Sequence, residues 1–155
     1  MAAERYNKFM KEEKFKLRSA VYLLPIRDGK VLLSRRFNTG WMDGEYSLIA
    51  GHLDGDETVF KAMVREALEE ANLTIDKKDL IPATVIHRKS DVEYIDFFFV
   101  VEKWKGEPNI NEPNKCDALE WFSLDNLPKN LLPYIKDAVE NYKNKIAFFE
   151  SGWNK

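Results

Sequence analysis

Three glutamates near the middle of the chain form the cluster best suited to chemistry. They are Glu66, Glu69 and Glu70, and Arg65 stands directly before them. Residues three or four positions apart share one side of an α-helix, so a helix here would bring the carboxylates together. Like charges one turn apart weaken a helix by a few tenths of a kcal/mol, so the cluster needs a cation. Mg²⁺ binds carboxylate and phosphate oxygens, and the spacing therefore favours a metal site for a phosphorylated substrate.

The apolar residues around this cluster repeat with helical periodicity from about residue 58 to residue 71. Glu66 and Glu70 fall at the seam between the apolar and the polar side of the predicted helix. A helix that only faced water would keep its carboxylates away from that seam. The alternative is a solvated acidic patch in which Arg65 pairs with Glu69.

The loop before the predicted helix contains Gly51 and Gly55 and ends at Glu57. Glycine permits backbone shapes that are closed to other residues, and here it would let a carbonyl turn toward the same metal ion. The loop therefore favours the metal site over the solvated patch.

Residues 51–73 resemble the Nudix box, whose pattern is a glycine, five residues, a glutamate, seven residues and a conserved helix end. In the family, that helix end reads Arg-Glu, an aliphatic residue, any residue, Glu-Glu, any residue, Gly and an aliphatic residue. The chain has Gly51, then Glu57 after five residues, and REALEEANL from Arg65 onward after seven more. One position departs, because Asn72 stands where the family has glycine. Asparagine is the next most tolerant residue for the left-handed conformation that ends such a helix, so we expect only a slight effect on stability.

The resemblance implies an α/β/α sandwich and hydrolysis assisted by a divalent cation, Mg²⁺ or Mn²⁺. The metal ligands that it implies are Glu66, Glu69, Glu70 and the Gly51 carbonyl. It also implies that Arg65 pairs with Glu57 and so holds the loop against the helix. Glu57 would in addition reach a metal through water.

Some members of the family place the general base outside the box, on a later loop. Glu112, Asp117 and Glu93 are the candidates here, and we favour Glu112. A solvated loop acid is the alternative interpretation of Glu112.

Four residues outside the box are candidates for binding the substrate. Arg35 and Arg36 could face a diphosphate, although strand arginines are also common as solvated edge charges. Phe37 could stack on a base, which contributes roughly 1–3 kcal/mol per base in other systems, or it could belong to the core. His87 lies on a strand that enters the predicted sheet and could instead be structural.

The length and composition fit one domain that spans residues 1–155, with residues 1–15 as an arm or short helix. The net charge of −2 gives no general attraction for nucleic acid, so we expect a nucleotide substrate and no stable nucleic-acid partner. The lone Cys116 excludes an intrachain disulfide, which suits the cytoplasm. We expect neither a signal peptide nor a membrane span, and either a monomer or a homodimer.

The hydrophobic pattern predicts a mixed β-sheet between two helices, an α/β fold. The 97–101 run lacks polar alternation, so it should be a central strand covered on both faces. Asp28 and Gly29 should form a hairpin turn. The expected strands cover residues 16–27, 30–37, 45–50, 83–89, 93–104 and 118–122. The expected helices cover residues 58–71 and 124–145, the second broken near Pro133.

These features favour a metal-dependent pyrophosphohydrolase that acts on a nucleoside diphosphate linked to another group. The stretch from Arg35 to Trp41 looks most like the MutT-type enzymes, which convert a nucleoside triphosphate into a monophosphate and pyrophosphate. ADP-ribose or another nucleoside diphosphate sugar is the alternative substrate. The alternative from another class is a catalytically silent Nudix-fold module that binds a nucleotide or a protein. Intact carboxylates argue against that module, which would not need a repulsive acidic cluster.

Overall fold

A computed structural model describes residues 14–154, so most of the predicted arm at residues 1–15 lies outside the described part of the chain. The strands are β1 (Arg18–Arg27), β2 (Lys30–Arg36), β3 (Tyr46–Ser47), β4 (Ile49–His52), β5 (Ile81–Lys89), β6 (Glu93–Val101), β7 (Cys116–Ser123) and β8 (Phe148–Ser151). The α-helices are α2 (Val59–Ala71) and α3 (Pro133–Asn144), and η1 (Lys77–Asp79) is a 3₁₀ turn.

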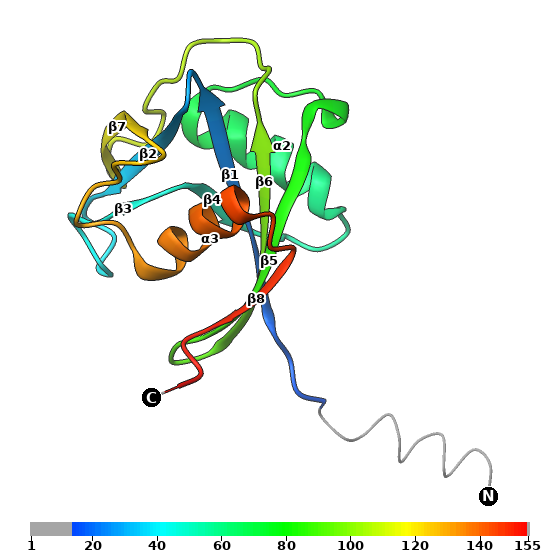
Figure 1. The fold of residues 1–155 in the computed structure, drawn as a ribbon. Coiled ribbons are helices and arrows are strands. Elements are labelled where there is room, and N and C mark those ends of the chain that lie inside the picture. The colour runs from blue at the N-terminus through cyan, green and yellow to red at the C-terminus, as the bar shows by residue number, and fades with distance from the viewer. Residues whose placement is uncertain (1–13, 155) are drawn as a thin grey trace, which may run out of the picture.

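The strands form a mixed sheet in the order β3-β2-β1-β6-β5-β8. β1 and β6 are parallel, as are β5 and β8, and the remaining pairs are antiparallel. Helices α2 and α3 cover opposite faces of the sheet (Figure 1). The predicted α/β/α sandwich is therefore confirmed.

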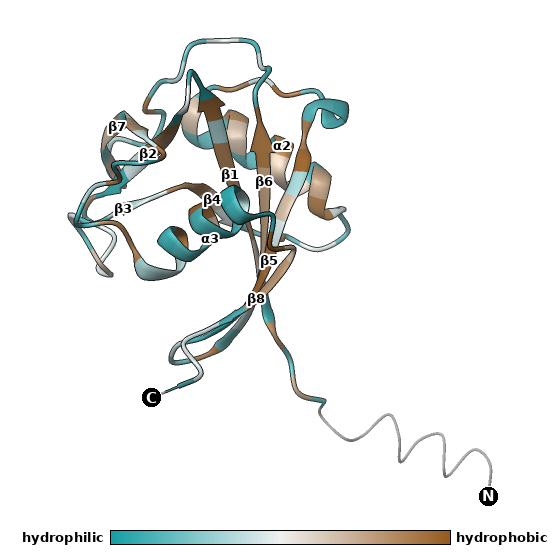
Figure 2. Ribbon diagram, in the orientation of Figure 1, coloured by the Kyte–Doolittle hydropathy of each residue, from teal (hydrophilic) through white to brown (hydrophobic). Residues whose placement is uncertain are grey.

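Two apolar clusters fill the spaces between the sheet and its helices. Alternate strand residues point to opposite faces, so Phe98 and Val100 of β6 pack on the α3 side. Phe99 and Val101 pack on the α2 side, against the apolar stripe of that helix. The central strand β6 ends in a hydrophobic run, whereas the outer strands β2 and β7 are mixed and much of α3 is hydrophilic (Figure 2). The prediction that residues 97–101 are covered on both faces is confirmed.

The sheet divides at β1, and this division makes room for a cleft. Residues 20–23 of β1 pair with β4, whereas Ile26 and Arg27 pair with β2. Beyond that point β2 pairs with β7 and β3 instead, so it diverges from β4. The predicted single strand at residues 45–50 is consequently wrong. The chain leaves β2 after Ser47, buries Leu48 in the core and joins β1 from Ile49.

The predicted helix at residues 124–145 is wrong in its first part, because α3 begins only at Pro133. Proline disfavours a helical residue before it and is well suited to the first helical position. The segment before it pairs instead with Tyr46, whose N–H donates to the Asn130 carbonyl and whose carbonyl accepts from Leu132. Strand β8 was not predicted, and β6 ends at Val101 instead of at residue 104. Neither described helix is long and apolar enough to cross a membrane.

Both ends of α2 are capped, the first by the Thr58 side chain and the last by the left-handed backbone of Asn72. The Thr58 side chain accepts a hydrogen bond from the Lys61 N–H and caps the first turn. Asn72 has φ 59° and ψ 30°, which is the left-handed conformation expected for it. The Asn72 N–H bonds to the Leu68 carbonyl, as in the αL motif, and the Leu73 N–H bonds to the Ala67 carbonyl, so carbonyls of the last turn are satisfied.

Replacing Asn72 with glycine should leave the free energy of unfolding unchanged or raise it slightly. Glycine removes the small strain of a left-handed asparagine, but it also makes the unfolded chain more flexible. Lys145 caps α3 with φ 55° and is the matched control. Lysine tolerates this conformation less well, so Lys145→Gly should gain up to about 1 kcal/mol. Urea unfolding measures both, and clear destabilisation by Asn72→Gly would contradict the capping role.

Candidate active site

A cleft of about 790 Å³ opens between α2, the divided sheet and the β5–β6 hairpin. Strand β2 supplies one wall, α2 supplies the acidic wall, and β4 runs beneath it. The predicted residues that line the cleft are Arg35, Arg36, Gly51, Arg65, Glu66, Glu69, Glu70 and Glu112. Glu57 is held behind Arg65, while Phe37 and His87 do not line the cleft.

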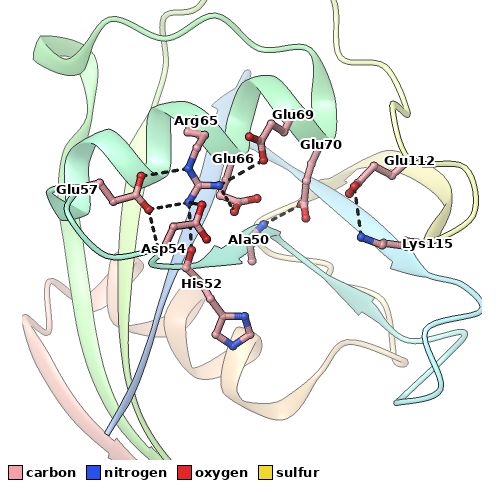
Figure 3. A network of polar contacts seen from close by, with 10 residues as sticks. All are labelled: Ala50, His52, Asp54, Glu57, Arg65, Glu66, Glu69, Glu70, Glu112 and Lys115. Carbon is pink, nitrogen blue, oxygen red and sulfur yellow. Dashed lines mark hydrogen bonds and ion pairs between the residues drawn. The ribbon is translucent and has the colours of Figure 1, made fainter. Parts of the chain in front are cut away.

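The Arg65 guanidinium group ties the acidic loop to α2 (Figure 3). Its Nε and Nη2 donate to the two Glu57 carboxylate oxygens at 3.1 and 2.8 Å, which is the pair that the resemblance implied. Nη2 also donates to the His52 carbonyl at 3.1 Å and lies 3.3 Å from an Asp54 carboxylate oxygen. A planar guanidinium suits such a role, because its five donors have fixed directions.

This pairing holds Glu57 in its ionised form. The hydrogen bonds from Arg65, followed by one from the Asp54 N–H, lower the pKa of Glu57 to about 2. The same carboxylate is the main reason that the pKa of Arg65 is raised. Both groups therefore keep their charges at every pH at which the protein would be assayed.

Gly51 has no side chain, and the Glu66 carboxyl group occupies the space where one would lie. A Cβ atom at this position would overlap the carboxyl group of Glu66. Gly51 lies in strand β4 and does not have a positive φ angle. Gly55, in the loop, does adopt the left-handed conformation, with φ 83°. The expectation that Gly51 is needed for an unusual backbone shape is therefore wrong, and the need is steric.

Glu66 and Glu70 are the two carboxyl groups of the cluster that α2 turns inward. Glu66 is 9% exposed and accepts from Arg65 Nη1 at 2.6 Å. Glu70 accepts from the Ala50 N–H at 3.1 Å. Loss of water raises the pKa of Glu66, and it raises the pKa of Glu70 to about 8. Glu66 and Glu112 add repulsion at Glu70, so Glu70 holds its proton near neutral pH and would ionise readily only with a cation beside it, whereas Glu66 already pairs with Arg65.

Glu69 is more exposed, and its carboxylate lies 3.3 Å from Arg65 Nη1. Arg65 thus contacts both Glu66 and Glu69. The contact with Glu69 is the pair expected from the alternative of a solvated acidic patch. Within residues 14–154 no group of three or more acidic, histidine or cysteine side chains converges as a metal site would require. The donors nevertheless fit a hard divalent cation, because buried Glu66 and half-buried Glu70 both present carboxyl oxygens to one cleft. Joining them would require Glu69 to turn away from Arg65.

The structure separates the three candidates for the general base. Glu112 lines the cleft and lies 3.3 Å from Lys115, facing Glu70 (Figure 3). Asp117 is bound by Arg35, and Glu93 lies beside His87 and Lys89 outside the cleft. Glu112 is therefore the one of the three that is placed to act on a molecule in the cleft.

Of the four predicted substrate-binding residues, Arg35 and Arg36 line the cleft. Arg35 holds Asp117 through Nε and Nη2, at 2.8 and 3.1 Å. Arg36 holds the Trp41 carbonyl and the Thr39 hydroxyl, each at 2.8 Å. Both arginines line the cleft but are already engaged by neighbouring protein groups.

Phe37 and His87 were predicted to bind substrate, and the structure places both outside the lining of the cleft. Phe37 is 45% exposed just beyond the end of β2 and does not line the cleft. The ring of His87 lies 4.7 Å from that of Trp153, on the outer side of β5. Side chains alternate along a strand, so the next residue, Arg88, faces the cleft instead.

Sequence reasoning missed a second group of cleft residues, which lies away from the acidic wall. Its members are Tyr22, Arg88, Tyr94 and Tyr134. They come from four separate segments of the chain. Lys115, which was also missed, lines the cleft beside Glu112. Periodicity could have placed Arg88 and His87 on opposite faces of β5, but it could not say which face borders the cleft.

Gly51→Ala should lower the free energy of unfolding by about 1–3 kcal/mol, because its methyl group would displace the Glu66 carboxyl group. The same change made together with Glu66→Ala should cost little, since the overlapping group is gone. Urea unfolding of the wild type, both single variants and the double variant measures this coupling. An equal cost of Gly51→Ala in both backgrounds would refute the steric explanation.

The metal-free protein should lose stability as the pH rises. Between the ordinary carboxyl pKa of 4.5 and about 8, folded Glu70 holds a proton that the unfolded chain has released. The folded state binds more protons in this window, so the free energy of unfolding falls with pH. Glu70→Gln should flatten this slope and make the protein more stable than wild type above pH 8.

Urea unfolding in the presence of a chelator, from about pH 5 to pH 9, tests this dependence. Glu140→Gln on α3 is the control, because Glu140 lies outside the cleft and its change should leave the slope intact. A wild-type slope in Glu70→Gln would show that Glu70 is not the group that titrates.

Several curated proteins are similar to this chain. An oxidized purine nucleoside triphosphate hydrolase from Danio rerio is 28% identical over 107 residues, which are 68% of this chain and 66% of that protein. An 8-oxo-dGTP diphosphatase from Escherichia coli is 27% identical over 77% of this chain and 94% of the relative. An ADP-ribose pyrophosphatase from Methanocaldococcus jannaschii is 30% identical over 81% of this chain and 78% of that one.

A solved structure and a protein-family model also match this chain, and both are described as NUDIX. The MutT NUDIX hydrolase of Burkholderia pseudomallei superposes with a TM-score of 0.76 at 27% identity, covering 82% of this chain and 98% of that chain. Residues 16–142 match the NUDIX domain family. This span includes the acidic wall, β4 and the whole cleft, and the chain is therefore a member of the Nudix hydrolase family.

Proposed function

We propose that this Nudix hydrolase cleaves a nucleoside triphosphate into a nucleoside monophosphate and pyrophosphate. The observation that carries the proposal is the buried carboxyl group of Glu66 next to the half-buried one of Glu70, on the acidic wall of the cleft. A deep acidic site repels a polyphosphate unless cations are present, so the arrangement suits a substrate that arrives with metal ions. The similarity to nucleoside triphosphate hydrolases supports this substrate class.

Nudix hydrolases generally use a divalent metal ion. We propose that Glu66, Glu69, Glu70 and the Gly51 carbonyl bind Mg²⁺ or Mn²⁺ here. When bound, the ion offsets negative charge on the phosphate oxygens and makes water a better nucleophile. Deprotonation of Glu70 accompanies binding, because a carboxylate must lose its proton to become a ligand.

The protein's own residues have three further roles in the proposal. Arg65 stays bound to Glu57 and holds the loop that carries His52 and Asp54. Glu112 faces Glu70 and accepts a proton from the attacking water. The water oxygen bonds to phosphorus while the anhydride bond between the α- and β-phosphates breaks.

Arg35 and Arg36 are the proposed contacts for the phosphates. Each binds its protein partners through Nε and Nη2, which leaves the donors of Nη1 for a ligand. Both arginines lie on the wall formed by β2, beside the acidic cluster. They would fix the orientation of the triphosphate without contributing to the hydrolysis itself.

A nucleoside diphosphate sugar such as ADP-ribose is the second candidate, because a relative of 30% identity is an ADP-ribose pyrophosphatase. The two substrates share the diphosphate and would use the same acidic wall. Incubation with Mg²⁺ and a panel of nucleoside triphosphates and ADP-ribose, with chromatographic identification of the products, separates them. Pyrophosphate release from a triphosphate supports the proposal, whereas exclusive formation of AMP and ribose phosphate would replace it with the second candidate.

Glu70→Gln should lower kcat by about 100-fold or more, because a charge fixed at the reacting phosphate is lost. It should also reduce the rise in Tm that Mg²⁺ gives the wild type, since ligand binding to the folded state stabilises it. Steady-state kinetics and thermal unfolding measure the two effects, with Glu140→Gln as the isosteric control. Near-normal turnover in Glu70→Gln would place the metal site elsewhere.

A further inference from the structure

Arg88 is a buried cation at a cleft surface that the proposed hydrolysis does not use. It is 7% exposed, yet it lines the cleft. Its Nε donates to Asp96 Oδ2 at 2.6 Å, and its Nη2 donates to Oδ1 at 3.5 Å. Asp96 is fully buried. A buried ion pair seldom stabilises a fold more than apolar residues of similar size would, so stability alone does not account for it.

Two tyrosine rings cover the flat guanidinium group of Arg88. The ring centres of Tyr94 and Tyr134 lie 4.1 and 4.2 Å from its central carbon. Tyr134 is itself steadied by the Tyr22 hydroxyl, which donates to the Tyr134 hydroxyl at 3.5 Å. Rings of this kind attract a guanidinium and fix its plane. The orientation of Arg88 is therefore set before any ligand arrives.

One edge of the guanidinium remains available. Within residues 14–154 Asp96 is the only hydrogen-bond acceptor that Arg88 contacts, and it occupies the edge formed by Nε and Nη2. The other edge, formed by Nη1 and Nη2, carries two parallel donors. Such a fork matches a ligand edge with two neighbouring acceptors.

We propose that Arg88 reads the base of the substrate through this fork and selects a ring edge with two adjacent acceptors. The O6 and N7 atoms of guanine form such an edge, whereas adenine offers a donor in place of O6. Asp96 acts as a positioning residue that holds the guanidinium. This inference rests on the proposed hydrolysis of nucleoside triphosphates, since it assigns the far end of the same cleft.

The charges around Arg88 favour an uncharged ring over another phosphate. Arg88 and Asp96 together carry no net charge, and Asp91 lines the cleft near the same hairpin. Arg36 binds only neutral groups through its hydrogen bonds to Trp41 and Thr39, so on the β2 wall it offers a positive charge that suits a phosphate better than the Arg88–Asp96 pair does. The base is therefore the part of a nucleotide that gains most from a neutral, preorganised fork.

Analogues of one base test the fork without changing the protein. The wild type should prefer dGTP and dITP, which share O6 and N7, over 7-deaza-dGTP, which lacks N7. It should also prefer them over 8-oxo-dGTP, whose N7 carries a hydrogen. One good bidentate contact corresponds to roughly 5- to 100-fold in kcat/KM. Calorimetric Kd values for dGMP and 7-deaza-dGMP without metal provide a second readout that needs no turnover.

Arg88→Lys keeps the charge beside Asp96 but removes the fork. It should lower kcat/KM for dGTP to the level of 7-deaza-dGTP and leave the latter little changed. Arg88→Met combined with Asp96→Leu removes both charges and should show the same pattern if the lysine variant does not fold. Arg18→Lys is the matched control, because Arg18 contacts Tyr94 from outside the cleft.

The outcomes distinguish this inference from the proposed function. Hydrolysis of all the analogues at equal rates, or an equal loss on all of them in Arg88→Lys, would overturn the fork and leave the hydrolase assignment intact. An equal loss would identify Arg88 as a phosphate contact. Binding of dGMP that depends on N7, without hydrolysis of any triphosphate, would support the fork and overturn the proposed function.

Discussion

The fold of the acidic wall depends on one guanidinium group. Arg65 binds the end of β4 at the His52 carbonyl and the loop between β4 and α2 at the carboxylate of Glu57. The same group contacts Glu66 and Glu69 from its own helix. Without that cation the helix would carry neighbouring negative charges with nothing to offset them, and the loop would have no fixed position against it. Arg65 therefore makes the acidic cluster compatible with a folded protein.

A second constraint comes from burial. Glu70 lies where water is largely excluded, and its pKa rises to about 8 because the ionised form is poorly solvated. Fold stability alone would favour an apolar residue at this position. A carboxyl group that is costly when ionised becomes favourable when a divalent cation provides its charge partner. The local instability and the proposed function thus have the same physical origin.

The cleft has two ends because the sheet divides. β1 pairs with β4 along one stretch and with β2 along another, so the acidic wall and the β2 wall face each other across the gap. The β5–β6 hairpin closes the far end with Arg88 and Tyr94, and α3 adds Tyr134. One end presents the acidic wall, which is proposed to bind the metal ion that accompanies the phosphates, and the other presents a neutral ion pair between aromatic rings. An elongated ligand with a charged and an uncharged part suits this distribution.

Sequence alone determined the features that depend on neighbours along the chain. Helical spacing placed Glu66, Glu69 and Glu70 on α2, and Asn72 adopts the left-handed conformation that local chemistry predicted. Apolar runs identified most strands, because burial on both faces leaves no polar alternation. These properties follow from backbone geometry and from contacts within a few residues.

Tertiary structure decided everything that depends on which segments meet. Gly51 is required because Glu66 packs against it from another element, and no property of residue 51 alone reveals that contact. The choice between His87 and Arg88 depended on which face of β5 borders the cleft. In each case the deciding energy comes from contacts between residues far apart in sequence, which local patterns do not encode.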